Sequence, residues 1–350
     1  MKRITIRDVA REAGVSVTLV SFVMNAKRDK DGRLDCPVNP DTAKRVLQVA
    51  ERLGYRRNFA AASLRSGKSN TIAVIPTDIS NKFFAGISRC IEDMAHKYGY
   101  TVFFASSDED AKRLSDVMDA FLAHNIDGVI VAPCTGGDAA IQKAIDARVP
   151  VVLLDRNIEG FSGVGKVLLD DAEAGRMGTS LMLDKGFRNV EMISYTLGIS
   201  SLSEREAGYR RAMMEHDLYD NARVHYTTYG DAANDVERFI KSAVERGVDG
   251  FFLPTYSLSA LVLSAMKKLG LKTPDDLAIL GFDESDIYSL YETTVSHIVQ
   301  PLKDLGEKSV EVLSAMIQGK EAQSIKLKPK LIIGGSTERI TKKQITTVNK

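Results

Sequence analysis

One stretch decides the fold of the N-terminal part of this chain: Thr5-Ile-Arg-Asp-Val-Ala-Arg-Glu-Ala-Gly-Val-Ser-Val-Thr-Leu-Val-Ser-Phe-Val-Met-Asn25. Thr5 precedes an amphipathic run with Asp8 at the spacing of a capping box, and Gly14 ends that run. Ser16 is placed to cap a second apolar run. The pattern predicts two short helices joined by a turn that contains glycine.

A third helix is predicted to start at the cap residue Asn39, with Pro40 in its first turn and apolar residues at helical spacing up to Leu53. Three short helices packed on one another are how a helix-turn-helix DNA-binding domain is built. The alternative is a helical module that binds another protein. The segment 26–38 contains Asp31-Gly32, a dipeptide typical of hairpin turns, and either adds phosphate contacts or is a solvated loop.

The charge of the chain is divided unevenly. Over 350 residues, 47 lysines and arginines are balanced by 46 aspartates and glutamates. Residues 1–70 hold 15 basic and 7 acidic side chains, a net of +8, whereas residues 71–350 hold 32 and 39, a net of −7. This asymmetry indicates a nucleic-acid-binding arm attached to an ordinary soluble body.

The cysteines and the N-terminal residues indicate the compartment. Cys36, Cys90 and Cys134 are odd in number and far apart, so neither a disulfide framework nor a thiolate metal site is predicted. The N-terminal residues lack the apolar core of a secretion signal, and no window approaches the length of a membrane span. We expect a cytoplasmic protein without membrane contact.

From residue 71 onward, short apolar runs alternate with longer amphipathic segments. This alternation predicts βαβ units, and therefore parallel sheets with helices on both faces. The strands are predicted at residues 71–75, 100–104, 128–131, 151–154, 190–193, 250–253 and 277–280. Because so many units do not fit one small sheet, the expected fold class is an all-α helix-turn-helix domain followed by an α/β core of two doubly wound parallel-sheet lobes.

The first stretch, together with later segments, resembles the LacI (lactose/galactose repressor) family of bacterial transcription regulators. The later segments include Ser63-Leu-Arg-Ser-Gly-Lys-Ser69, Asp78-Ile-Ser-Asn-Lys-Phe-Phe84, Glu204-Arg-Glu-Ala-Gly-Tyr209 and Leu280-Gly-Phe-Asp283. The resemblance implies a hinge helix after the helix-turn-helix and a core like a periplasmic sugar-binding protein. Such a core dimerises and binds a small effector between its two lobes.

The resemblance also suggests domain boundaries. The expected domains are a helix-turn-helix at 1–57, a hinge helix and linker at 58–69, a first lobe at 70–160 plus 284–325, a second lobe at 161–283 plus 326–337, and a tail at 338–350.

The DNA-binding residues are carried over from the family by position. In a helix-turn-helix the second helix enters the major groove, and short polar groups around it bind phosphates. The implied base-reading residues are Val17, Thr18 and Phe22. The implied phosphate contacts are Thr5, Ser16, Ser21 and Asn25. Where the family often has arginine, Phe22 offers only apolar contact, so the operator sequence of relatives does not transfer to this chain.

The hinge segment, residues 58–66, is too short to be a stable helix alone in water. The resemblance implies that it folds in the minor groove, where Leu64 wedges between base pairs and kinks the duplex. The implied hinge contacts are Asn58, Ala61 and Leu64, and Arg57, which stands where the family usually has proline, adds a charge suited to phosphate. The alternative is a plain linker whose leucine faces a core.

The effector residues are also implied by position, mostly just beyond the carboxyl ends of parallel strands. They are Phe83, Phe84, Asp155, Arg156, Ser201, Arg205, Tyr256 and Asp283. Carboxylates and arginines hold hydroxyls or a carboxylate, and an aromatic face covers a sugar ring, so the expected effector is a sugar or sugar acid. Pro254-Thr255-Tyr256 departs from the family's usual Asn-Asp, which leaves the effector's identity open.

Other functions find little support in the sequence. Phosphate-binding, nucleophile-elbow and metal-binding motifs are absent, so no catalytic residue, metal or cofactor is predicted. A periplasmic solute-binding protein, the alternative, shares the body but does not account for the basic helical arm. The sequence predicts a DNA-binding transcriptional regulator, a homodimeric repressor on a pseudo-palindromic operator, whose effector binds between the lobes.

Overall fold

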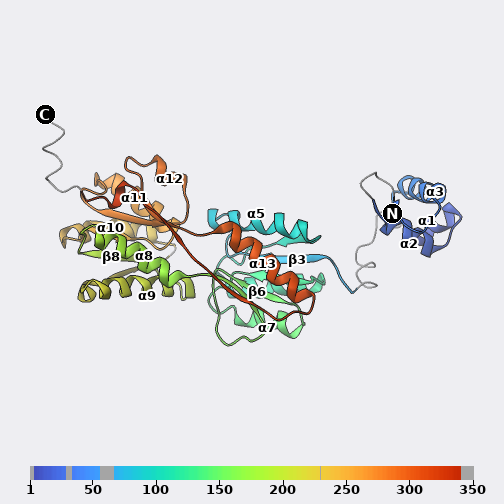
Figure 1. The fold of residues 1–350 in the computed structure, drawn as a ribbon, viewed down its shortest axis with the longest axis horizontal. Coiled ribbons are helices and arrows are strands. Elements are labelled where there is room, and N and C mark those ends of the chain that lie inside the picture. Colours follow the sequence, from blue (N-terminus) through green and yellow to red (C-terminus); the bar gives the residue numbers. More distant parts are fainter. Residues whose placement is uncertain (1–3, 29–33, 56–66, 229, 340–350) are drawn as a thin grey trace. The chain divides into compact units, whose positions relative to one another are not determined.

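The computed structural model describes residues 4–28, 34–55, 67–228 and 230–339. The chain forms two compact units, residues 1–69 and residues 70–350 (Figure 1). The first unit is helical, and the second contains two six-stranded sheets.

The N-terminal unit is a packed set of helices. They are α1 (Ile6–Ala13), α2 (Val17–Asn25) and α3 (Pro40–Arg52). The predicted capping box of Thr5 and Asp8 is present, and Gly14 ends α1 in the left-handed region at φ 63°. Val9, Val20 and Val46 are fully buried where the helices meet. The predicted helices and their caps are confirmed.

The segment between α2 and α3 contains two short antiparallel strands. They are β1 (Lys27–Arg28) and β2 (Leu34–Asp35), with Lys27 opposite Asp35. Half-buried Leu34 packs against the helical core. The predicted turn, Asp31-Gly32, lies outside the described residues and stays a prediction.

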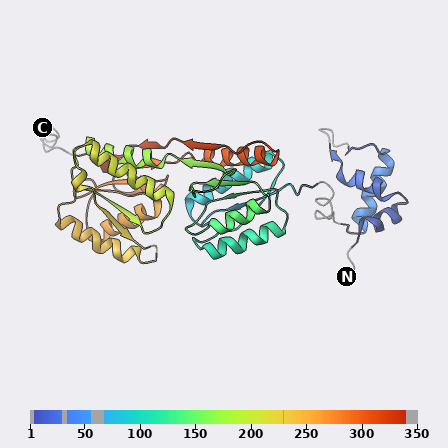
Figure 2. The same cartoon turned by 90° about the horizontal axis from the view of Figure 1, so that it is seen from below.

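The first lobe of the C-terminal unit is built on a parallel sheet with the strand order β13-β7-β6-β5-β3-β4. Its strands are β3 (Thr71–Ile75), β4 (Thr101–Phe104), β5 (Gly128–Val131), β6 (Val151–Leu154), β7 (Gly165–Leu169) and β13 (Ser324–Leu327). Its helices are α5 (Lys82–Lys97), α6 (Ala111–Ala123), α7 (Asp138–Asp146) and α13 (Leu302–Ile317). One apolar core lies under α5 and α13, and the other under α6 and α7, as the layers in Figure 2 show.

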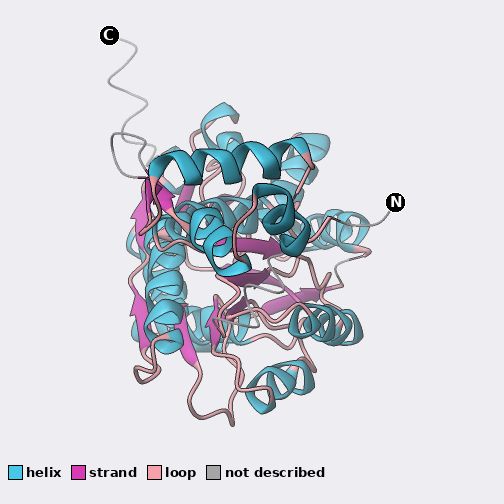
Figure 3. Ribbon diagram, turned by 90° about the vertical axis from the view of Figure 1, so that its right-hand side faces the viewer, coloured by secondary structure: helices cyan, strands magenta, loops and turns pink. Residues whose placement is uncertain are grey.

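The second lobe repeats this strand order as β14-β12-β11-β10-β8-β9. Its strands are β8 (Val190–Tyr195), β9 (Val224–Thr227), β10 (Gly250–Phe252), β11 (Ala278–Phe282), β12 (Ser296–Val299) and the antiparallel β14 (Lys330–Ile332). Its helices are α8 (Asp171–Asp184), α9 (Ser200–Glu215), η1 (Tyr219–Asn221), α10 (Ala232–Glu245), α11 (Tyr256–Leu269), α12 (Asp286–Leu290) and η2 (Gly335–Thr337). Apolar cores lie on both faces of this sheet, as expected for a doubly wound sheet. Figure 3 shows the helices of the chain in cyan and the strands in magenta.

The boundaries predicted between the lobes are wrong at β7 and β12, and the boundary predicted after residue 325 cuts β13, which belongs to the first sheet. We placed residues 161–283 in the second lobe, but β7 pairs with β6 in the first sheet, with Lys166 opposite Leu153. We placed residues 284–325 in the first lobe, but β12 pairs with β11 in the second sheet, with Ser296 opposite Leu280. Hydrogen bonding across the sheet, rather than position along the chain, decides which lobe a strand joins.

The chain therefore crosses between the lobes three times. The crossings lie at Asp170 between β7 and α8, at Gln300-Pro301 between β12 and α13, and at Lys328-Pro329 between β13 and β14.

Of the helices in the described ranges, none combines the length and the apolar character needed to cross a membrane.

Candidate functional site

The face of α2 opposite the helical core carries the predicted base-reading residues. Val17 and Phe22 are 41% and 51% exposed, and Thr18 is also exposed, whereas Val20 and Val23 are buried. Phe22 therefore does not belong to the core of this unit. A large exposed apolar ring is suited to contact with an apolar group such as a thymine methyl.

The polar residues around α2 have local partners. The Thr5 hydroxyl donates to Asp8 at 2.7 Å, and Ser16 Oγ accepts from the Leu19 amide at 3.2 Å. Ser21 is only 9% exposed, and its hydroxyl accepts from Nδ2 of Asn25 at 3.0 Å. The Ser21 hydroxyl is thus engaged with Asn25 of its own helix, and the phosphate contact expected of it stays a prediction.

The hinge residues that we expected to contact DNA lie outside the described residues. They are Arg57, Asn58, Ala61 and Leu64. Their contacts stay predictions.

Direct contacts join the two lobes at the carboxyl ends of their strands. The Asn157 amide, just after β6, donates to Ser200 Oγ at the start of α9 over 2.7 Å. Lys82 Nζ, at the start of α5, lies 2.9 Å from a carboxylate oxygen of Asp286 in α12. The strand ends that bear the predicted effector residues therefore face each other, as is typical of ligand-binding α/β folds.

Arg205, on α9, is held by groups of the second lobe. Its Nε donates to Oδ1 of Asp171 at 2.7 Å, and its Nη1 donates to the Pro254 carbonyl at 2.6 Å. Its guanidinium carbon also lies 3.8 Å from the centroid of the Phe282 ring. Arg205 and Asp171 are 4% and 3% exposed, so this is a buried, hydrogen-bonded ion pair. Ser201, one turn earlier on α9, is also buried.

Close packing of α8 against α9 brings Asp171 to Arg205. A Cβ atom added at Gly175 of α8 would lie 2.0 Å from the Arg205 carbonyl oxygen. A Cβ added at Gly208 of α9 would lie 2.0 Å from the Ala172 carbonyl oxygen. Only glycine permits these two backbones to approach so closely.

Arg156, directly after Asp155, is held mainly within the first lobe. Its two terminal nitrogens donate to the two oxygens of Glu109, each at 2.8 Å. Its Nε lies 3.4 Å from Oδ2 of Asp155.

The predicted residues Phe83 and Phe84 are buried in the apolar core of this lobe, with ring centroids 4.9 Å apart. Their rings serve the packing of α5.

Asp283, directly after β11, is oriented by two donors from the second lobe. Its Oδ1 accepts from Nε2 of the buried Gln300 at 2.7 Å, and its Oδ2 accepts from the Tyr256 amide at 3.4 Å. Tyr256 is the first residue of α11, where Thr255 is the cap. The contact seen for Tyr256 therefore comes from its backbone.

The carboxylates of the inter-lobe site act on one another electrostatically. Burial raises the pKa of Asp155 and of Asp283, and it raises the pKa of Asp171 to about 7. The positive charge of Arg205 opposes this effect and lowers all three pKa values. The negative charge of Asp155 raises the pKa of Asp171 and of Asp283. Charges from both lobes thus affect the pKa values of the same carboxylates.

Three partners of the predicted residues were not predicted from the sequence: Glu109, Asp171 and Gln300. Asp171 follows β7, a strand that we did not predict, so nothing marked it as a residue at a strand end. Gln300 lies between β12 and α13, and a single glutamine before a proline gives no signal of a binding site. No local signal distinguishes Glu109 from a surface carboxylate.

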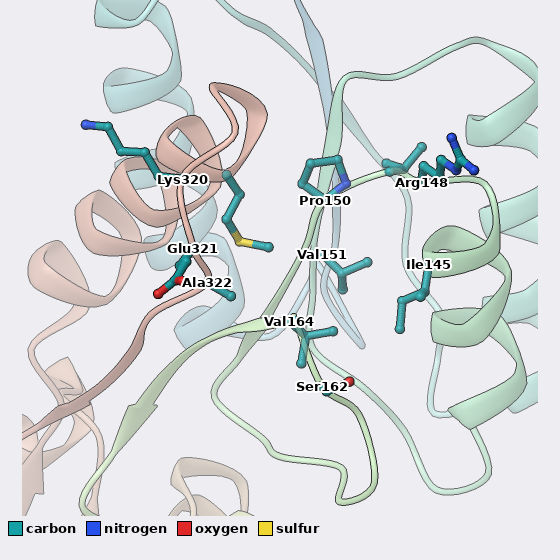
Figure 4. Close-up of a pocket in the computed structure, with 12 residues that line it drawn as sticks. Ile145, Arg148, Pro150, Val151, Ser162, Val164, Lys320, Glu321 and Ala322 are labelled. Carbon is teal, nitrogen blue, oxygen red and sulfur yellow. The ribbon is translucent and has the colours of Figure 1, made fainter.

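A surface pocket of about 620 Å³ lies elsewhere, at the amino ends of β6 and β7 (Figure 4). Pro150, Val151 and Val164 line one side, and Lys320 and Glu321 lie on the other. None of the predicted effector residues contributes to it.

Within the described ranges, no three histidine, cysteine, aspartate or glutamate side chains are arranged to hold a metal ion.

Two family models match this chain. Bacterial regulatory proteins of the lacI family match residues 5–58, and the periplasmic binding protein domain matches residues 72–321. Catabolite control protein A of Priestia megaterium is 32% identical over 317 residues, covering 89% of this chain and 92% of that protein. The chain belongs to the LacI family of bacterial regulatory proteins.

Other relatives align with this LacI-family protein over nearly its whole length. The ribose operon repressor of Halalkalibacterium halodurans is 29% identical, with 95% of this chain and 97% of that protein covered. The lac repressor dimer bound to operator and an anti-inducer has the same fold, with a TM-score of 0.81 at 20% identity, covering 97% of this chain and all of that one. The fold of the LacI family thus extends over both units.

Proposed function

We propose that this LacI-family protein is a repressor whose affinity for a DNA operator is set by a small sugar or sugar acid bound between the lobes. One observation carries the proposal. Charged side chains stand where strand ends of the two lobes face each other: Asp155 directly after β6 in the first lobe, and Asp283 directly after β11, with Arg205 of α9, in the second. A ligand there touches both lobes at once.

The mechanism rests on this double contact. A ligand shifts an equilibrium between two lobe arrangements only if it binds one arrangement better than the other. A sugar held by Asp155 on one side and by Asp283 and Arg205 on the other favours the arrangement in which these groups are close. The change in lobe spacing then alters the ability of the hinge segment to fold on DNA, and the operator is released.

The DNA side of the proposal rests on α2. Val17, Thr18 and Phe22 are exposed together on one helix of a unit that carries a net charge of +8 over residues 1–70. Phosphate neutralisation by these basic residues gives affinity, and the exposed face of α2 gives specificity. We propose a homodimer on a pseudo-palindromic operator, because two copies of α2 then read two half-sites.

The same reasoning bears on the alternatives. One relative is by name a ribose operon repressor, and we propose that this protein acts in the cytoplasm with no catalytic role. A solute-binding protein is less well supported, because it leaves the exposed recognition face of α2 without a function.

Operator selection tests the proposal. The full chain is used to enrich random duplexes at moderate salt, and the selected site is then titrated by fluorescence anisotropy with and without a panel of sugars and sugar acids. We expect an enriched palindrome whose affinity falls in the presence of one class of ligand. Enrichment of no palindrome, or a palindrome whose affinity no panel member changes, contradicts the proposal.

A further inference from the structure

The two arginines of the inter-lobe site already have partners. Both terminal nitrogens of Arg156 donate to Glu109 at 2.8 Å. Arg205 donates from Nε to Asp171 and from Nη1 to the Pro254 carbonyl. A carboxylate or phosphate is held best by two parallel hydrogen bonds from one guanidinium edge. In the described structure, each such edge has at least one nitrogen already engaged.

Three buried polar atoms of the site have no hydrogen-bond partner among the described residues; one is the donor Nε of Arg156, 3.4 Å from Asp155, and the other two are acceptors. Oε1 of Gln300, beside Asp283, and Oδ1 of Asn157, two residues after Asp155, are buried and have no partner among the described residues. The oxygens of Asp155 and Asp283 are acceptors as well when these groups are ionised. A ligand that satisfies these atoms must donate hydrogen bonds.

The balance of charge points the same way. The ionisable groups of the site are the carboxylates of Glu109, Asp155, Asp171 and Asp283 and the guanidiniums of Arg156 and Arg205. Fully ionised, the carboxylates exceed the guanidiniums by two. In a site shielded from water, an added anion is therefore repelled by more charges than attract it.

We propose that the effector carries no negative charge and is a neutral, unphosphorylated sugar whose hydroxyls donate to Asp155 and Asp283. Asp171 is the residue that excludes acidic ligands, because it occupies the arginine that would otherwise bind them. The inference rests on the proposed function, and it narrows the expected sugar or sugar acid to the neutral sugar.

Matched ligands test the proposal. Full-length protein at pH 8 is titrated calorimetrically with neutral sugars and with their acidic counterparts: glucose, glucuronate and glucose 6-phosphate; galactose, galacturonate and galactose 6-phosphate; ribose and ribose 5-phosphate. We expect a neutral member to bind at least tenfold more tightly than its own acid and phosphate. An acid or phosphate that binds as tightly as its parent sugar overturns the proposal, and so does a panel in which no neutral sugar binds.

Variants test the role given to Asp171. In Asp171→Asn, Arg205 keeps its charge but loses its carboxylate partner, so we expect the affinity for the acidic counterpart to rise at least tenfold. Glu109→Gln should do the same through Arg156 and serves if Asp171→Asn does not fold. Asp184→Asn, an exposed aspartate at the far end of α8, is the matched control and should change nothing. Folded variants that gain no affinity for acids overturn the assignment to Asp171.

The proposed function fails in a different way. If a neutral sugar binds and the affinity for the selected operator is the same with and without it, regulation by this site is contradicted while the preference for a neutral ligand stands.

Discussion

Asp155 and Asp283 occupy equivalent positions in the two lobes. Each directly follows the third strand of its sheet, β6 or β11, counted from the edge formed by β13 or β14. Each also has a left-handed backbone, with φ of 67° and 65°. Residues other than glycine adopt this conformation at a cost, and strained residues of this kind cluster at functional sites. The two lobes thus present the same carboxylate, in the same backbone conformation, from opposite sides.

We predict that Arg205→Ala abolishes the response to effector but changes operator affinity without ligand by less than about threefold. The substitution removes the guanidinium with which we propose the second lobe holds the effector, and it leaves the DNA-binding unit unaltered. Anisotropy titrations with and without effector measure both quantities.

The control for Arg205→Ala is Arg210→Ala on the same helix. Arg210 lies outside the inter-lobe site, and its Nε is 2.8 Å from a carboxylate oxygen of Glu206. It should respond like the wild type. A full effector response in Arg205→Ala would remove Arg205 from the site.

We predict that Phe22→Arg changes the preferred base at one position of each half-site toward guanine, by about 1–3 kcal/mol. Phe22 is exposed and has no donor, whereas arginine donates to two acceptors of guanine in the major groove. Repeated operator selection measures the change. Phe22→Leu, which stays apolar, should not acquire the guanine preference, and an unchanged motif in Phe22→Arg would place this position away from the bases.

We predict that Asp171 makes the C-terminal unit less stable as pH rises from about 4 to 7. In the unfolded chain the carboxyl titrates near its ordinary pKa of about 4, but burial raises its pKa in the folded protein to about 7. The folded state therefore binds more protons over this range, and its stability falls by at most about 4 kcal/mol. Thermal unfolding of wild type and Asp171→Asn between pH 4 and 8 should show a weaker decline in the variant. Parallel curves would contradict the raised pKa.

We predict that Gly175→Ala lowers the free energy of unfolding by about 1–3 kcal/mol, since the new methyl group has to displace the backbone of Arg205. Alanine would otherwise stabilise a helix interior relative to glycine. Gly86→Ala on α5 is the control, because its methyl would meet only the tip of Leu302 at 3.0 Å. Chemical denaturation measures both variants. Equal stability of the two would mean that α8 and α9 separate at little cost.

The helical unit could be predicted from the sequence because its signals are local. The cap of Thr5 and Asp8, the turn at Gly14 and the cap at Asn39 each act within a few residues of the helix they delimit. The lobe boundaries could not be predicted in the same way. Whether β7 or β12 joins one sheet or the other depends on hydrogen bonds to strands that precede it, and no residue within these strands encodes that choice.

The inter-lobe site shows the same division. Asp155, Arg205 and Asp283 were named through the family resemblance, and they stand on elements whose ends face each other across the lobes. Asp171 was not named, because its importance comes from Arg205, 34 residues away, and from the glycine contacts between α8 and α9. A partner that depends on helix packing leaves no pattern in its own neighbourhood.

The three crossings between the lobes have a consequence for synthesis of the protein. The last strand of the first sheet, β13, pairs with β7, with Ser324 opposite Lys166. Contacts so distant along the chain form late, because a long loop must close first. On the ribosome, the helical unit can fold as soon as it emerges, but the first lobe cannot complete its sheet until residue 327 has left the exit tunnel. During most of translation the nascent chain therefore carries a finished DNA-binding unit ahead of an incomplete sensor.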